Sequence, residues 1–517
     1  MSQLRIHIAY GSESGNTEAL AQQLIQQPFL QPYSPTLATI NDTDFATFDQ
    51  QSLLILLTSS FGDGEPPANA NAFSEKMENL TAVSFRYCLF GLGDTTYDKF
   101  CGFSQSVEQQ LQTKRAKPLI ERVDADLNYQ AIFKQWLPLL QQAIETLPEQ
   151  AISHQLSVQV YNEQTTYDAE VLEIKQLANS EPPVYHIRLS LKDSGIFYQA
   201  GDLLYVRVQQ PEALLQDYVQ WFNDPNAAEL LRHKELRLLS KNVLRDIQKI
   251  CGNAELKDLT KISNKKSLEQ YLYGRDVLDV LRDFDPKTSV SLTDLSDILA
   301  NLTARAYSIS SCSECYPDYV DLCVRYIGYQ LNDRLYQGTA SGYLAQLKPR
   351  SKIAVFLKSN PTFHLPTNPS TPIVMIGAGT GIAPYIGFLQ RLASLPNKVE
   401  SDLFFGERYQ AKDFLYQTEL QQFQQQGVLT GLFTAFSRDQ AEKYYVQNAL
   451  ADQAEHVWQR IQQGAIFYVC GSKTMSKAVD ETLIEIAQKI GNKPYIDDFN
   501  NIIAELIANG QLFRDIY

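Results

Sequence analysis

Long hydrophobic runs are absent from this 517-residue sequence. No apolar stretch approaches the roughly 18 residues that a membrane-spanning helix needs. Residues 1–8 also lack the basic start, apolar stretch and small-residue cleavage site of a secretory signal, and their pattern is typical of a strand. We therefore expect a soluble, cytoplasmic protein without a membrane anchor.

Positive charge is in short supply. The chain has 45 lysines and arginines against 59 aspartates and glutamates, which gives a net charge of -14. A nucleic-acid-binding face needs clustered basic residues, so this composition argues against that class of function. An acidic surface is compatible with docking to a basic protein partner, although most of the charge can equally serve solubility.

Cysteine is also sparse, with seven residues scattered along the chain. That scatter favours reduced thiols over a disulfide framework. The one close pair, Cys312 and Cys315, has no second pair and no histidine nearby, so we expect an ordinary loop with two thiols and neither metal nor redox use.

The remaining composition is that of an ordinary globular chain, 44% hydrophobic and 20% charged, long enough for about three domains. The continuous apolar runs at residues 53–57 and 87–90 indicate parallel strands that are covered on both faces. A helical stripe, Ile132, Trp136, Leu140, Ile144 and Leu147, follows and stops at Pro148. These patterns predict an α/β doubly wound domain over residues 1–147 and a short linker at 148–156.

The rest of the chain changes texture twice. Alternating, β-branched segments predict an antiparallel β-barrel over residues 157–210 and 297–366, with a strand at 158–160, and residues 211–296 read as a helical insertion. From residue 367 to 517, buried strands alternate with helices again, which predicts a second parallel α/β domain. The predicted fold class is therefore a multidomain α/β protein.

A hydroxyl-rich turn follows the first predicted strand. Its side chains and backbone N–H groups would point at one spot beside a helix N-terminus, which is an anion cradle. Since the turn has no lysine or arginine, it suits a phosphate monoester better than a triphosphate with magnesium. A plain helix cap is the alternative. The turn residues are Ser12, Ser14, Gly15, Asn16 and Thr17.

Two glycine-rich aromatic loops leave the carboxyl ends of later strands, where α/β sheets bind ligands. Together their rings could sandwich a flat molecule such as the isoalloxazine of flavin mononucleotide (FMN). A single such ring would more often be surface packing; three matching loops at three strand ends favour the FMN hypothesis. The loop residues that we select are Ser59, Phe61, Gly62, Gly64, Gly93, Asp94 and Tyr97.

A second flavin pattern lies about 200 residues further on, at Arg305-Ala306-Tyr307-Ser308. In an extended segment, alternate residues share one face. Arg305 could neutralise a pyrophosphate, Tyr307 could stack on a flavin, and Ser308 could hydrogen-bond the reactive flavin nitrogen. The small-residue turn Gly338-Thr339-Ala340-Ser341 offers N–H groups for a second phosphate contact.

A glycine loop and a basic patch predict a third ligand. Gly377-Ala378-Gly379-Thr380-Gly381 follows a buried strand and opens a helix, so it could receive a dinucleotide pyrophosphate, with Gly379 and Thr380 as the selected contacts. A 2′-phosphate needs basic and hydroxyl groups, and the patch therefore favours NADPH over NADH. Its residues are Ser437, Arg438, Lys443, Tyr445 and Gln447, the last three on one face if that segment is an extended strand.

On these motifs, the front segment resembles flavodoxin, and the whole chain resembles the diflavin reductases, which join a flavodoxin to a ferredoxin-NADP reductase. The segments at residues 91–97 and 122–126 are most similar to the flavoprotein subunit of bacterial NADPH-sulfite reductase. Asp124 and Asp126 could shape the polar edge of FMN or could be solvated charges.

The resemblance implies roles for further residues. Gly201 and Asp202 correspond to a segment that contacts FAD in the family, and Ser308, Cys470 and Asp515 to the site of hydride transfer. Tyr517 corresponds to a near-terminal ring that covers FAD and moves aside for nicotinamide. Cys470 could equally be a buried strand residue, and Tyr517 a frayed end.

These observations together predict an NADPH-dependent diflavin reductase with the cofactors FMN, FAD and NADPH. Its expected acceptor is the haemoprotein subunit of sulfite reductase. Relatives typically carry an N-terminal extension that assembles the oligomer, and Met1 lies close to the first predicted strand, so the oligomer and the partner stay open. The alternatives are a soluble reductase of a haemoprotein monooxygenase and a flavin-binding electron-transfer module that has lost NADPH turnover.

Overall fold

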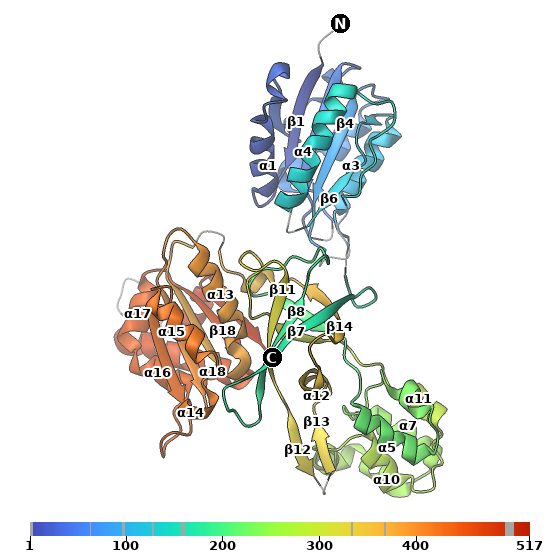
Figure 1. The fold of residues 1–517 in the computed structure, drawn as a ribbon, viewed down its shortest axis with the longest axis vertical. Helices are drawn as coiled ribbons and strands as arrows, with labels where there is room; N and C mark the ends of the chain where they lie inside the picture. The colour runs from blue at the N-terminus through green and yellow to red at the C-terminus, as the bar shows by residue number, and fades with distance from the viewer. Residues whose placement is uncertain are drawn as a thin grey trace. The chain divides into compact units, whose positions relative to one another are not determined.

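The computed structural model describes residues 4–62, 64–95, 99–126, 129–156, 161–331, 334–366, 369–491 and 501–517. It divides into two compact units (Figure 1). The front unit comprises residues 1–161 and 195–197, and the rear unit comprises residues 162–194 and 198–517. Within the described ranges, no helix is both long enough and apolar enough to cross a membrane. The predicted strand at residues 158–160 lies outside these ranges.

The front unit is a parallel sheet with helices on both faces (Figure 1). The strand order is β2-β1-β3-β4-β5. The short strands β5 and β6 share the last position, because β5 pairs with the start of β4 and β6 with its end. The strands are β1 (Arg5–Gly11), β2 (Thr36–Thr39), β3 (Ser52–Ser59), β4 (Arg86–Leu92), β5 (Lys117–Pro118) and β6 (Val123–Ala125); the helices are α1 (Asn16–Ile25), α2 (Phe73–Glu78), α3 (Gly102–Thr113) and α4 (Tyr129–Thr146).

Strand β3 shows why the apolar runs are continuous. Leu53, Ile55 and Leu57 pack in one core cluster with α1 and α4, whereas Leu54 and Leu56 pack in another with α2 and α3. Because successive side chains of a strand point to opposite faces, a strand covered on both sides must be apolar throughout. The order found here places the sheet's switch point, where such folds bind ligands, between β1 and β3.

The rear unit begins as an antiparallel barrel. Its sheet has the order β10-β9-β14-β7-β8-β11, and a bridge between Ile309 and Leu322 joins the two ends of that order. The strands are β7 (Tyr167–Leu177), β8 (Val184–Ser190), β9 (Leu203–Val206), β10 (Arg305–Ser308), β11 (Tyr319–Arg325) and β14 (Lys352–Lys358); the hairpin β12 (Gly328–Leu331) and β13 (Arg334–Gln337) and the helix α12 (Thr339–Gln346) lie between β11 and β14.

Seven helices separate β9 from β10 and pack around their own core. Helix α10 shows how the sequence fixes a boundary. The Asp276 side chain accepts a hydrogen bond from the Asp279 backbone N–H, and the Asp279 side chain accepts one from the Asp276 backbone N–H; this reciprocal pair is a capping box. The helices are α5 (Glu212–Phe222), α6 (Ala227–Leu231), α7 (Lys241–Cys251), α8 (Ala254–Leu259), α9 (Lys265–Leu272), α10 (Val277–Phe284) and α11 (Leu292–Ile298).

The last part of the rear unit is a parallel sheet with the order β17-β16-β15-β18-β19, covered on both faces. The strands are β15 (Ile373–Ala378), β16 (Ser401–Glu407), β17 (Gly431–Phe436), β18 (Ile466–Gly471) and β19 (Leu512–Ile516); the helices are α13 (Ala383–Ser394), α14 (Gln410–Asp413), α15 (Gln417–Gln425), α16 (Val446–Asp452), α17 (Ala454–Gln462), α18 (Lys473–Ile490) and α19 (Ile502–Ala508). The two parallel sheets and the antiparallel barrel match the predicted fold class.

Candidate functional site

The hydroxyl-rich turn in the front unit joins β1 to α1. Gly15 is the N-cap of α1 in a left-handed conformation with φ of 86°, and no side chain in the described part of the protein caps the helix. The helix-cap alternative is therefore not realised. The buried hydroxyl of Ser12 has no hydrogen-bond partner among the described residues. Uncapped N–H groups and an unpartnered hydroxyl beside a helix N-terminus fit an anionic group.

Thr17 has a different place from the one that the sequence suggested. Its side chain is fully buried, and its hydroxyl donates to the Gly11 carbonyl oxygen at 2.7 Å. Gly11 itself packs tightly, because a Cβ there would lie 2.7 Å from Thr58 Oγ1. Thr17 thus shapes the turn from beneath, while Ser14 and Asn16 are exposed on it.

The first aromatic loop is a tight turn at the end of β3. The backbones of Phe61 and Glu65 pair, and Gly62 and Gly64 adopt positive φ values of 49° and 96°. The turn leaves the Phe61 ring 57% exposed, which is unusual for a large apolar side chain beside polar loops. An exposed ring at a sheet's ligand-binding edge fits stacking on a flat ligand.

The second aromatic loop lies outside the described residues at Tyr97, but its start is described. Gly93 donates to the Ala125 carbonyl oxygen, and Thr95 donates its hydroxyl to Asp126 at 2.6 Å. Asp126 therefore holds the described start of this loop at Thr95. Asp124 is held by Arg122 and by the Ser104 hydroxyl, so it braces the sheet.

A cleft of about 950 Å³ lies in the rear unit. Both predicted flavin segments line it, together with the glycine loop and the end of the chain. The predicted residues that line it are Arg305, Tyr307, Ser308, Gly338, Thr339, Ala340, Ser341, Gly379, Thr380, Asp515 and Tyr517. Gly201 and Asp202 do not line it: Asp202 is fully buried and bonds His364, which ties β9 to the segment before β15.

Arg305 enters the cleft with a carboxylate beside it. Its Nη2 atom donates to Glu235 Oε2 at 3.1 Å, and the other Glu235 oxygen accepts from the N–H groups of Arg237 and Leu238. Gly338 is the N-cap of α12, which has no side-chain cap, so its first N–H groups face the same cleft as Arg305. A guanidinium opposite an uncapped helix start fits a pyrophosphate.

Ser308, Asp515 and Cys470 meet at three strand ends. The Ser308 hydroxyl donates to Asp515 Oδ2 at 2.6 Å, and Cys470 Sγ lies 3.7 Å from the same oxygen. Cys470 on β18 pairs directly with Asp515 on β19. Burial, and then the neighbouring Asp515, raise the pKa of the Cys470 thiol well above its ordinary value, so this side chain stays a neutral thiol.

Tyr517 lies against the glycine loop. Its hydroxyl is 3.1 Å from Thr380 Oγ1, and its backbone N–H donates to Gly471. Tyr517 lines the cleft together with Ser308. Tyr517 is thus anchored through both its side-chain hydroxyl and its backbone N–H, whereas a frayed terminus would make neither contact.

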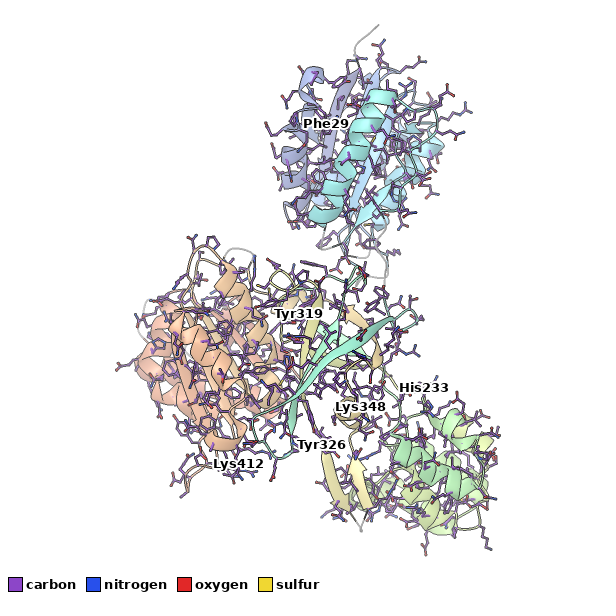
Figure 2. The ribbon with its side chains drawn as sticks, in the orientation of Figure 1. Phe29, His233, Tyr319, Tyr326, Lys348 and Lys412 are labelled. Carbon is purple, nitrogen blue, oxygen red and sulfur yellow. The ribbon has the colours of Figure 1, made fainter. Side chains whose placement is uncertain are left out.

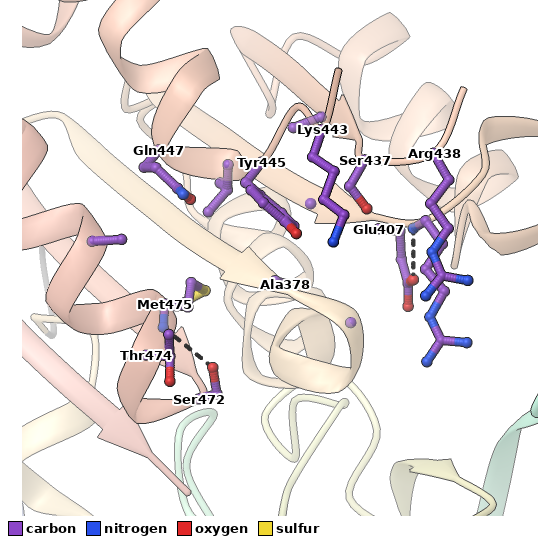
Figure 3. A pocket seen from close by; sticks show the side chains of 16 residues that line it. Ala378, Glu407, Ser437, Arg438, Lys443, Tyr445, Gln447, Ser472, Thr474 and Met475 are labelled. Atoms are coloured by element: carbon purple, nitrogen blue, oxygen red, sulfur yellow. Dashed lines mark hydrogen bonds between the residues drawn. The ribbon is translucent and has the colours of Figure 1, made fainter. Parts of the chain in front are cut away.

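A second pocket, of about 490 Å³, gathers the whole predicted basic patch (Figure 3). The expectation of an extended strand through residues 443–447 is wrong, because Tyr445 is the N-cap of α16 and Gln447 lies in that helix. Lys443, Tyr445 and Gln447 nevertheless line one pocket with Ser437 and Arg438.

Several lining residues were not predicted, and they connect the two pockets. Glu407 and Arg408 line both, and Arg325 lines the cleft; Glu407 bonds Arg325, whose buried Nη1 has no partner within the described ranges. Burial and then Arg408 lower the pKa of Arg325. Glu407 ends the buried parallel strand β16 and Arg408 follows it, and the carboxyl end of such a strand is where ligand-binding residues are expected. Arg325 and Glu235 carry no comparable local signal.

Two family models match the chain. A flavodoxin model covers residues 8–136, and an oxidoreductase NAD-binding domain model covers residues 375–481. The fold, the site and these matches define the class: a redox protein that joins a flavodoxin module to a nicotinamide-coenzyme module.

Curated relatives then give the family. The sulfite reductase (NADPH) flavoprotein alpha-components of Bacillus subtilis and Salmonella typhimurium are each 32% identical over 99% of this chain, which covers 89% and 90% of their lengths. That of Escherichia coli O157:H7 is 33% identical over 99% of this chain and 90% of its own length. The chain belongs to the family of sulfite reductase flavoprotein alpha-components.

Proposed function

We propose that this protein is an NADPH-dependent diflavin reductase that serves the haemoprotein subunit of a sulfite reductase. Electrons would pass from NADPH through FAD and FMN to that partner. One observation carries the proposal: Ser308 and Asp515 meet with Cys470 beside a cleft that also holds Arg305 and the glycine loop. A flavin segment and a coenzyme segment therefore converge on one point.

The front unit supports an FMN site. The Ser12 hydroxyl and the uncapped start of α1 offer neutral donors to a phosphate, and the exposed Phe61 ring offers a stacking surface. The absence of a basic side chain in the turn Ser12–Thr17 favours a mononucleotide phosphate that is already partly neutralised by backbone donors.

The rear cleft supports FAD. Arg305 and the first N–H groups of α12 would hold the pyrophosphate, and Tyr307 would stack on the flavin ring. Burial raises the pKa of Tyr307, so its ring stays neutral. Ser308 would hydrogen-bond the flavin nitrogen that accepts hydride, and Asp515 orients that hydroxyl by accepting its hydrogen bond.

The second pocket supports NADPH. Arg438 and Lys443 would neutralise the 2′-phosphate, with the hydroxyls of Ser437 and Tyr445 as further donors (Figure 3). The pyrophosphate would lie at Gly379, where a Cβ would be 3.5 Å from Arg325 Nη2. Tyr517, which bonds Thr380 in that loop, would occupy the place of nicotinamide and move when the coenzyme enters.

The flavins, when bound, supply the conversion of electron pairs into single electrons, and the chain positions them and excludes water. We also propose the division into an FMN module at residues 1–147, a linker at 148–156, an FAD barrel at 157–210 and 297–366, a helical insertion at 211–296 and a coenzyme domain at 367–517.

The acceptor can be tested by reconstitution. The purified chain would be mixed with a sulfite reductase haemoprotein subunit, NADPH and sulfite, and sulfide formation would be followed alongside cytochrome c reduction. The proposal predicts sulfide only when both proteins are present. Brisk cytochrome c reduction without sulfide would show a diflavin reductase that serves another acceptor.

A further inference from the structure

Cys312 and Cys315 lie at the two ends of one tight turn, between β10 and β11. The N–H groups of Cys315 and Tyr316 both donate to the Cys312 carbonyl oxygen, at 3.2 and 2.9 Å. A turn closed by such a bond brings the Cα atoms of its first and fourth residues within about 7 Å. A disulfide needs a Cα separation of roughly 4.4 to 6.8 Å, so the turn brings the two cysteines close to the separation that a disulfide requires.

The two thiols differ in exposure. Cys312 is 2% exposed, whereas Cys315 is half-buried. Burial is the main cause that raises the pKa of Cys312 to about 12; the N–H of Cys315 opposes it, and the Cys315 thiol adds to it. Because a thiolate is the reacting species, a reagent from solution would meet Cys315 first.

The turn is held firmly against helix α13. The Cys312 N–H donates to Gln390 Oε1 at 2.9 Å, and Cys315 Sγ lies 3.5 Å from the Gln390 carbonyl oxygen. Glu314 also pairs with Arg391. Gly387 permits this approach, since a Cβ there would lie 2.5 Å from the Ser311 carbonyl oxygen. The next strand starts at Tyr319, labelled in Figure 2.

We propose that Cys312 and Cys315 are a redox-modification site that forms a reversible disulfide by exchange with glutathione disulfide. Cys315 attacks the disulfide, forms a mixed disulfide and releases one glutathione thiolate. Cys312 then attacks the Cys315 sulfur and releases the second. Two protein thiols are oxidised to one disulfide, one glutathione disulfide is reduced to two glutathiones, and the two protein protons pass to these products.

This site is separate from the flavin and coenzyme contacts. Neither cysteine lines the cleft or the basic pocket. The disulfide would replace the contact between Cys315 and Gln390, and α13, which bears Gln390, begins directly after the glycine loop Gly379–Ile382. Oxidation of the turn would thereby remove one contact of α13, the helix that follows the glycine loop.

The test uses the holoprotein with its flavins bound. It would be equilibrated with glutathione disulfide, quenched with acid and alkylated, and the peptide that spans both cysteines would be analysed by mass spectrometry. Wild-type protein should lose two hydrogen masses on this peptide, resist alkylation there and regain both thiols with dithiothreitol. Cys251→Ser, which removes another half-buried thiol, is the control and should behave like wild type.

Two variants separate the steps. Cys312→Ser should stop at a stable glutathione adduct on Cys315, and Cys315→Ser should leave Cys312 unmodified because it is buried. The proposal is overturned if both wild-type thiols remain open to alkylation. It is equally overturned if wild type accumulates the same mixed disulfide as Cys312→Ser, since Cys312 would then not resolve it.

Discussion

At the scale of single residues, Arg438 faces only the basic pocket and should serve only the 2′-phosphate. Hydrogen bonds to charged groups contribute about 1.5 to 3 kcal/mol, so Arg438→Ala should raise the Michaelis constant for NADPH about tenfold or more. NADH lacks this phosphate, and its Michaelis constant should stay unchanged. Steady-state kinetics with both coenzymes would measure this, and an unchanged preference for NADPH would place the phosphate elsewhere.

Arg325 provides the matched comparison. It lies beside Gly379 in the cleft and pairs with Glu407, so it should contact the pyrophosphate that NADPH and NADH share. Arg325→Ala should therefore raise both Michaelis constants by a similar factor, about tenfold, without loss of FAD. An effect on NADPH alone would contradict this assignment, and loss of FAD would show that Arg325 serves the flavin.

Asp515 should act through Ser308. Asp515→Asn keeps the size of the side chain but removes the charge of the group that accepts the Ser308 hydrogen bond. We expect NADPH-driven flavin reduction to slow about tenfold or more, with normal FAD content and normal NADP binding. Ser308→Ala should match it. Stopped-flow reduction would measure the rate. A wild-type rate in Asp515→Asn would show that Asp515 has no role in hydride transfer.

Only some of the site residues can be identified from the local sequence. Arg305, Ser308 and the glycine loop lie in short motifs whose chemistry can be read locally. Arg325 and Glu235 cannot be found that way, because each reaches the cleft through tertiary packing. Arg325 ends β11, whose pairing with β8 fixes its direction, and Glu235 lies between helices of the insertion. Tyr445 lines one pocket with the other residues of the basic patch, but the extended strand predicted for it is wrong, because the sequence carries no clear signal for the capping of α16.

At the scale of elements, the turn between β1 and α1 should hold the FMN phosphate independently of the FAD site. Ser12→Ala removes the unpartnered hydroxyl and should weaken FMN binding about tenfold, while FAD content stays constant. Thr113→Ala is a suitable control, because Thr113 ends α3, which runs back from the carboxyl end of β4. Fluorescence titration of FMN would decide, and equal affinities in the two variants would refute the cradle.

The interface between β8 and the coenzyme sheet should respond to pH. The His186 ring lies 3.2 Å from the Tyr416 hydroxyl and 3.6 Å from Asp321. The charges of Arg188, Glu173 and Glu419 also influence its pKa. Burial is the largest influence and lowers the pKa of His186 below 6.5. As pH falls through 6.5, His186 takes up a proton more readily in the unfolded chain than in the folded protein, so the free energy of unfolding decreases.

Thermal unfolding at about pH 7.5 and about pH 5.5 would test this effect. His186→Gln should lose less stability on acidification than wild type, because it has no proton to take up. His233→Gln, at an exposed position (Figure 2), should behave like wild type. Equal pH dependence in all three proteins would mean that His186 titrates normally.

At the scale of the whole molecule, the broad architecture was predictable. Continuous apolar runs marked both parallel sheets, and alternating segments marked the barrel between them. The pairing of β10 with β9 across seven helices was not readable, because register between strands so distant in sequence is set by tertiary contacts. That pairing is what brings Arg305 and Ser308 to the coenzyme domain.

The proposed function depends on one property of the protein: a single chain that holds two different flavins and takes electrons from NADPH. Cofactor extraction combined with an anaerobic reductive titration tests it most directly. We expect one FMN and one FAD per chain, uptake of four electrons per chain with dithionite, and reduction of both flavins when NADPH is the donor. A chain that retains only FAD and takes up two electrons, or one whose flavins stay oxidised with NADPH, would contradict it.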